Sequence, residues 1–140
     1  MSRKLLALTM LLALLVGLMP GTSLAQEPVT LKYATFTGSG DRAEELDQII
    51  QAFQAENPHI TIEVISAPFD DYFTMLQADF VAGEPPDVLE LNYENFVAYA
   101  ASGVLLDVSE YLDPETPYYP GALNAFKYQG AQMALPETFS

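Results

Sequence analysis

The chain contains no cysteine and no tryptophan, and it is poor in basic residues. Its 5 lysines and arginines stand against 19 acidic residues, which gives the 140-residue chain a formal net charge of −14. Without disulfides, the fold must depend on its hydrophobic core. The negative field repels phosphate backbones, so we exclude nucleic acid as a partner and favour a neutral polar ligand or a cation. Because His59 is the only histidine, we expect no metal and no cofactor.

The N-terminal segment has the pattern of a secretory signal peptide. A positive start at Arg3 and Lys4 precedes an apolar run over residues 5–19, and small residues lead up to Ala25. The run is shorter than the roughly 20 residues that a membrane anchor needs. We therefore expect residues 1–25 to be removed. Gln26 stands where a lipoprotein would carry its lipid-bearing cysteine, so we expect a soluble periplasmic or extracytoplasmic protein without a lipid anchor.

The rest of the chain predicts alternating strands and helices. Apolar and β-branched runs, helical spacing and Gly or Pro stops predict strands at 29–37, 60–65 and 87–91 and helices at 41–57, 69–83 and 95–102. This βαβαβα order predicts an α/β fold with a parallel sheet, right-handed crossovers and helices on both faces. We interpret residues 87–91 as the central strand. Beyond Gly103 we expect a short helical turn, a helix at 121–126 and a hairpin at 128–132.

Polar and aromatic residues follow each predicted strand, at the edge of an open parallel sheet where ligands bind. Hydroxyl and carboxylate groups can hydrogen-bond a neutral polar ligand, and an aromatic face can lie against an apolar face of it. The candidates are Thr37, Gly38, Ser39 and Asp41 after the first strand, Phe69 and Asp70 after the second, and Asn92, Tyr93 and Glu94 after the third.

Each group also has a purely structural interpretation. The Gly-Ser-Gly turn can be only a tight turn before a helix that Asp41 caps together with Glu44. Asp70 can cap the second helix while Tyr72 fills the core. Likewise, Glu94 or Asn95 can cap the third helix. A phosphate site at the first turn is disfavoured, because acidic side chains crowd it and no lysine follows the glycines.

Several motifs in order resemble the N-terminal portion of extracellular solute-binding proteins of ABC importers, in the family 1, sugar-binding group that includes the maltose-binding protein. These motifs are Phe-Gln-Ala-Glu-Asn-Pro at 53–58, Pro-Phe-Asp-Asp-Tyr at 68–72, Pro-Asp at 86–87, Phe-Val-Ala-Tyr-Ala-Ala-Ser-Gly at 96–103, and Tyr-Gln-Gly at 128–130 leading to Ala-Leu-Pro at 134–136. The resemblance covers the mature chain but only about the first third of a family member.

The resemblance implies a type II periplasmic-binding-protein fold with two lobes around a ligand cleft. Residues 26–134 would form part of the first lobe, and residues 135–140 would begin the crossing to a second lobe that this chain does not encode. Glu137 and Thr138 would line the cleft near that crossing. Such a chain would bind ligand poorly by itself, because the opposite wall is missing.

By this resemblance we expect a monomeric substrate-binding component that captures a sugar or oligosaccharide and delivers it to a membrane permease. Binding of another small solute, such as a polyamine, a cation or a peptide, is the alternative. We do not expect an enzyme, because His59 alone serves no catalytic triad and there is no Gly-x-Ser-x-Gly elbow. A carboxylate pair of a secreted carbohydrate-active enzyme is the remaining enzymatic alternative.

Overall fold

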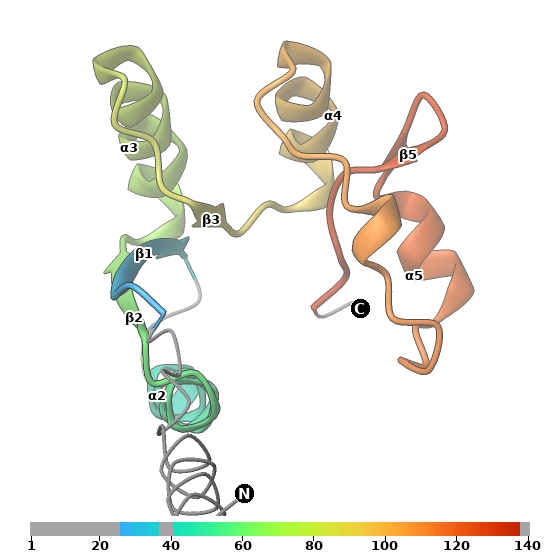
Figure 1. The fold of residues 1–140 in the computed structure, drawn as a ribbon. Helices are drawn as coiled ribbons and strands as arrows, with labels where there is room; N and C mark the ends of the chain where they lie inside the picture. Colours follow the sequence, from blue (N-terminus) through green and yellow to red (C-terminus); the bar gives the residue numbers. More distant parts are fainter. Residues whose placement is uncertain (1–25, 37–40, 138–140) are drawn as a thin grey trace, which may run out of the picture.

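A computed structural model describes residues 26–36 and 41–137. For Asp41 it describes only the backbone. Three strands form a parallel sheet in the order β2-β1-β3 (Figure 1). Strand β1 (Val29–Thr35) pairs along its whole length with β2 (Ile60–Ser66), from Val29 opposite Ile60 to Thr35 opposite Ser66. Strand β3 (Val88–Leu89) pairs only with Tyr33 and Ala34. The α/β fold with a parallel sheet is confirmed.

Among the described strands, β1 lies between β2 and β3. The central place expected for residues 87–91 in the complete first lobe stays a prediction. Val88 is half exposed, and β3 contributes two ladder residues. Backbone bonds extend this contact at both ends, from Asp87 N to Lys32 O (3.0 Å) and from Glu90 N to Ala34 O (2.9 Å). The pairing between β1 and β3 is therefore short, and hydrogen bonds from the residues on either side of β3 extend it.

Helix α3 (Phe69–Ala82) supplies the core on one face of the sheet. Tyr72 and Leu76 are fully buried against Ala34 of β1, and the side chains of β2, β3 and the following segment surround them. The helix ends as predicted at Gly83, whose positive φ of 78° is the left-handed conformation that glycine adopts at helix C-termini. The predicted core position of Tyr72 is confirmed.

Helix α2 (Asp41–Glu56) is present as predicted, but its apolar stripe is not fully covered. It contacts β2, where Gln54 Oε1 accepts a hydrogen bond from the backbone N–H of Ile62 (2.8 Å). Ile49 is 66% exposed and Phe53 41% exposed. The described part of the chain thus leaves much of this stripe in contact with solvent.

The second half of the chain forms a smaller cluster beyond β3 (Figure 1). Its elements are α4 (Tyr93–Ser102), the 3₁₀ turn η1 (Ser109–Tyr111), α5 (Pro120–Ala125), β4 (Lys127–Tyr128) and β5 (Ala131–Gln132). Buried Phe96 of α4 contacts the ring of Phe126 edge-on at 5.2 Å. Strands β4 and β5 form the predicted hairpin, and Gln132 Nε2 donates to the carbonyls of Leu123 and Ala134. These bonds join the hairpin to α5.

Candidate functional site

The carboxyl ends of the three parallel strands meet at one edge of the sheet. Strand β1 ends at Thr35, β2 at Ser66 and β3 at Leu89, and all three run in the same direction. The segments that follow these strands therefore start close to one another. This is the edge at which ligands bind in open α/β sheets, and it is the edge that the sequence predicted.

The candidates after β1 are largely outside the described residues. Thr37, Gly38 and Ser39 belong to that segment, and their role stays a prediction. Asp41 is the first residue of α2, and its side chain is also outside the description, so its capping role is untested. The described end of this connection is Phe36, which follows Thr35 directly.

Phe69 and Asp70 form the first turn of α3, directly after β2. Phe69 is 48% exposed, and its ring contacts Phe36 edge-on with centroids 5.2 Å apart. Asp70 does not cap the helix as the structural interpretation expected. The N-cap position falls on Pro68, which makes no side-chain capping bond, and Asp70 instead places an acidic group in the first turn. An exposed carboxylate thus lies next to an exposed aromatic ring, the combination predicted for a sugar.

Asn92, Tyr93 and Glu94 lie where β3 leads into α4. The helix is capped by Asn92, not by Glu94 or Asn95, because Asn92 Oδ1 accepts hydrogen bonds from the backbone N–H of Asn95 (3.2 Å) and from its Nδ2 (2.7 Å). Tyr93 is 60% exposed and contacts Phe126 edge-on at 6.3 Å. Tyr93 and Glu94 are therefore accessible, whereas the oxygen of Asn92 is already engaged.

Glu90 is a residue of this edge that sequence reasoning missed. It follows β3 directly, and its Oε2 accepts hydrogen bonds from Thr35 Oγ1 (2.6 Å) and from the backbone N–H of Phe36 (3.1 Å). Thr35 is completely buried, and this partly buried contact ties the end of β1 to the end of β3. The available signal was a charged residue between Leu89 and Leu91, inside an otherwise apolar run.

Tyr72, on α3, also connects the end of β1 with the end of β3. Its hydroxyl lies 2.9 Å from the carbonyl oxygens of both Ala34 and Glu90, and it accepts from the N–H of Glu90 at 3.1 Å. Burial raises the pKa of Tyr72 above its ordinary value, with the nearby Glu90 charge acting in the same direction. The phenol is therefore held in its neutral, hydrogen-bonding form.

Glu137 interacts electrostatically with two residues of the sheet region, Glu90 and Tyr33. Desolvation raises the pKa of the Glu137 carboxyl, the charge of Glu90 raises it further, and Arg42 opposes the shift. Glu137 is exposed as a residue, yet this carboxyl group is partly desolvated. Burial, Glu137 and Glu90 together raise the pKa of Tyr33 to about 12. The C-terminal segment thus brings a second carboxyl group toward the sheet, although the role of Glu137 in binding stays a prediction.

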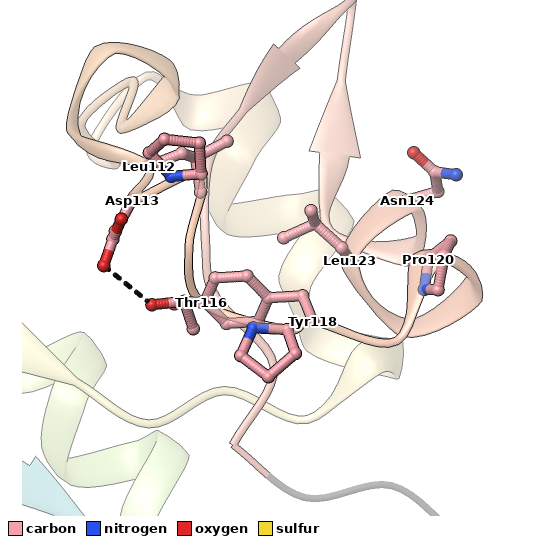
Figure 2. Close-up of a pocket in the computed structure, with 9 residues that line it drawn as sticks. Leu112, Asp113, Thr116, Tyr118, Pro120, Leu123 and Asn124 are labelled. Carbon is pink, nitrogen blue, oxygen red and sulfur yellow. Dashed lines mark hydrogen bonds between the residues drawn. The ribbon is translucent and has the colours of Figure 1, made fainter.

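Two hollows in the described surface lie away from this edge. One of about 310 Å³ is formed by the proline-rich segment from Leu112 to Tyr118 and by α5, and a hydrogen bond of 3.2 Å from Thr116 Oγ1 to Asp113 Oδ2 closes its turn (Figure 2). The other, of about 460 Å³, lies around Gln26, Asn57 and His59. Neither contains a predicted ligand residue.

The described residues contain no group of three or more histidine, cysteine, aspartate or glutamate side chains arranged to hold a metal ion. Among these same residues, no helix combines the length and the apolar character required to cross a membrane.

Sequence comparison connects residues 38–139 with the family described as bacterial extracellular solute-binding protein. A protein of Streptomyces antibioticus called an uncharacterized lipoprotein in the oleD 5′ region is 32% identical over 108 residues, which is 77% of this chain and 24% of the relative. An uncharacterized ABC transporter extracellular-binding protein of Pyrococcus horikoshii, PH1039, is 27% identical over 114 residues, covering 81% of this chain and 27% of the relative.

Solved structures share the fold. The ABC substrate-binding protein Lmo0181 of Listeria monocytogenes, solved in complex with cycloalternan, is 36% identical with a TM-score of 0.67, over 76% of this chain and 28% of that one. A family 1 extracellular solute-binding protein of Alicyclobacillus acidocaldarius is 29% identical with a TM-score of 0.65, over 77% and 28%. The sugar-binding protein MalE of Xanthomonas citri, at 24% identity and a TM-score of 0.67 over 77% and 28%, shows the fold alone.

The chain spans about a quarter of the length of these relatives. The match extends over most of the chain from the β1–α2 connection onward, and the resemblance expected from the sequence motifs is confirmed. The chain belongs to the bacterial extracellular solute-binding protein family.

Proposed function

We propose that this chain forms one wall of the ligand site in a substrate-binding protein of an ABC importer, which captures a sugar or oligosaccharide and delivers it to a membrane permease. The observation that carries the proposal is the shared carboxyl edge of the parallel sheet. There the exposed ring of Phe69 and the carboxylate of Asp70 follow β2, and the segment of Asn92 to Glu94 follows β3.

The chemistry of this edge suits a neutral, hydroxyl-rich ligand. Aromatic rings cover the apolar face of a sugar, and carboxylates accept bonds from its hydroxyl groups. The formal net charge of −14 disfavours anionic ligands. A relative of 36% identity was solved with cycloalternan, which supports a carbohydrate ligand here as well. The residues predicted from the sequence remain our candidates for ligand contact.

A cationic solute such as a polyamine is the second candidate, because the charge of Glu90 raises the pKa of the Glu137 carboxyl and both carboxyl groups raise the pKa of Tyr33. Calorimetric titration of the full-length mature protein with neutral oligosaccharides, spermidine and a short peptide separates the two. We expect heat of binding from an oligosaccharide. Binding of spermidine or peptide without any response to carbohydrate would refute the sugar proposal.

We also propose that the protein releases its ligand unchanged and works outside the inner membrane after removal of residues 1–25. Mass spectrometry of the bound sugar after incubation should show no cleavage, and a broken glycosidic bond would refute a pure binding role. N-terminal sequencing of the exported protein should begin at Gln26. Retention of the apolar segment would refute processing at that point.

A further inference from the structure

Strand β3 is joined to β1 by two carboxylates that bracket it. At its start, Asp87 Oδ2 accepts a hydrogen bond from the backbone N–H of Lys32 (2.8 Å). At its end, Glu90 Oε2 accepts from Thr35 Oγ1 and from the backbone N–H of Phe36. The two groups do similar structural work, but only Glu90 lies at the carboxyl edge of the sheet, where the ligand is expected.

Phe36 connects Glu90 with Phe69, which is a predicted ligand residue. The backbone of Phe36 is held by Glu90, while its ring contacts Phe69 at 5.2 Å and Tyr72 at 5.2 Å, both edge-on. Phe69 is in turn edge-on to Phe73 at 5.5 Å. A shift in the backbone of Phe36 would therefore move the surface against which Phe69 is packed. Ring contacts among Phe36, Phe69 and Phe73 provide the route by which such a displacement would reach Phe69.

We propose that Glu90 is a positioning residue for ligand binding: it fixes the end of β1 and thereby the ring of Phe36, against which the predicted ligand residue Phe69 packs. This inference rests on the proposed function for its ligand. The contacts that carry this inference are hydrogen bonds accepted by Glu90 Oε2, so we expect the role to require an acceptor oxygen rather than a negative charge. A side chain that keeps an oxygen in the same place should preserve the function.

Three variants of the full-length mature protein test this inference. Glu90→Ala removes the acceptor, Glu90→Gln keeps an acceptor oxygen but loses the charge, and Asp87→Ala is the matched control at the other end of β3. We expect Glu90→Ala to lower affinity for the bound oligosaccharide about tenfold, a loss of roughly 1.4 kcal/mol. Glu90→Gln and Asp87→Ala should each stay within about threefold of the wild type.

Amide hydrogen exchange of the ligand-free protein provides a readout that does not depend on any sugar. Glu90→Ala should accelerate exchange at Phe36 more than Asp87→Ala does, at matched losses of thermal stability. Equal exchange at Phe36 in the two variants would overturn the positioning role. If the wild type binds no sugar, the proposed function fails, while a selective change at Phe36 would still establish that Glu90 positions this segment.

The affinity pattern separates positioning from direct contact. An equal loss in Glu90→Gln and Glu90→Ala would overturn the inference, because it would mean that binding requires the negative charge of Glu90 and not merely an acceptor oxygen at this position. Equal losses of affinity in Glu90→Ala and Asp87→Ala would mean that both variants act only by destabilising the fold, and this result would also overturn the inference. If Glu90→Ala does not fold, Thr35→Val replaces it; it removes only the hydroxyl donor, and we expect a smaller but still selective change at Phe36.

Discussion

The hydroxyl of Tyr72 should be worth a measurable part of the stability of the sheet. The perturbation is Tyr72→Phe, which removes one oxygen and leaves the ring in place. That oxygen lies within 3.1 Å of three backbone groups, namely the carbonyls of Ala34 and Glu90 and the N–H of Glu90. Tyr72 is 0% exposed, so water cannot replace the lost partner without a rearrangement.

A net contribution of about 0.5–1.5 kcal/mol for each hydrogen bond, and about 1–3 kcal/mol for a buried group deprived of its partner, places the expected loss near 1–3 kcal/mol. The assay is denaturant unfolding of the full-length mature protein, followed by circular dichroism. Tyr111→Phe is the matched control: it removes the same group from a residue that is 75% exposed, and it should change the free energy of unfolding by less than about 0.5 kcal/mol. Equal effects of the two changes would refute the assigned role of Tyr72.

Two further predictions follow from backbone conformation and from titration. Gly83→Ala should destabilise the protein by about 1 kcal/mol, because Gly83 has a φ of 78° at the end of α3. Gly121→Ala, inside α5, should be neutral or stabilising. Thermal unfolding of both variants tests this, and equal shifts in their melting temperatures would contradict it. The pKa of Tyr33 is raised to about 12, so the folded protein favours the neutral phenol. The resulting contribution to the free energy of unfolding is complete below the unfolded pKa of about 10 and is lost as the pH rises toward about 12. The wild type should therefore lose more stability than Tyr33→Phe over that window, and parallel stability curves would contradict the assignment.

The order of strands and helices could be predicted because each has a local pattern. Helix α3 ends at Gly83 and α4 at Gly103 as expected, both in the left-handed conformation. The hairpin expected at 128–132 is also present, and the structure gives Gln129 and Gly130 positive φ angles at its turn. These features depend on residues close together in the chain, which is why the sequence is sufficient to specify them.

The order across the sheet could not be predicted in the same way, because strand neighbours are set by contacts between distant residues. The run at 87–91 predicted a strand of five residues, but only Val88 and Leu89 enter the ladder with β1. The partnership of Glu90 with Thr35 spans 55 positions in the sequence and leaves no local pattern. The cap of α4 was misplaced for a different reason, since Asn92, Glu94 and Asn95 are all plausible caps and only the backbone turn selects Asn92.

The location of the ligand is the central claim, and backbone chemical shifts recorded during titration test it most directly. The full-length mature protein would be labelled and titrated with the oligosaccharide that gives the strongest heat of binding. We expect the largest shifts at the carboxyl edge of the sheet, around Phe69 and Asp70 and from Asn92 to Glu94. Shifts confined to the hollow between Leu112 and Asn124, with the edge of the sheet unchanged, would contradict it.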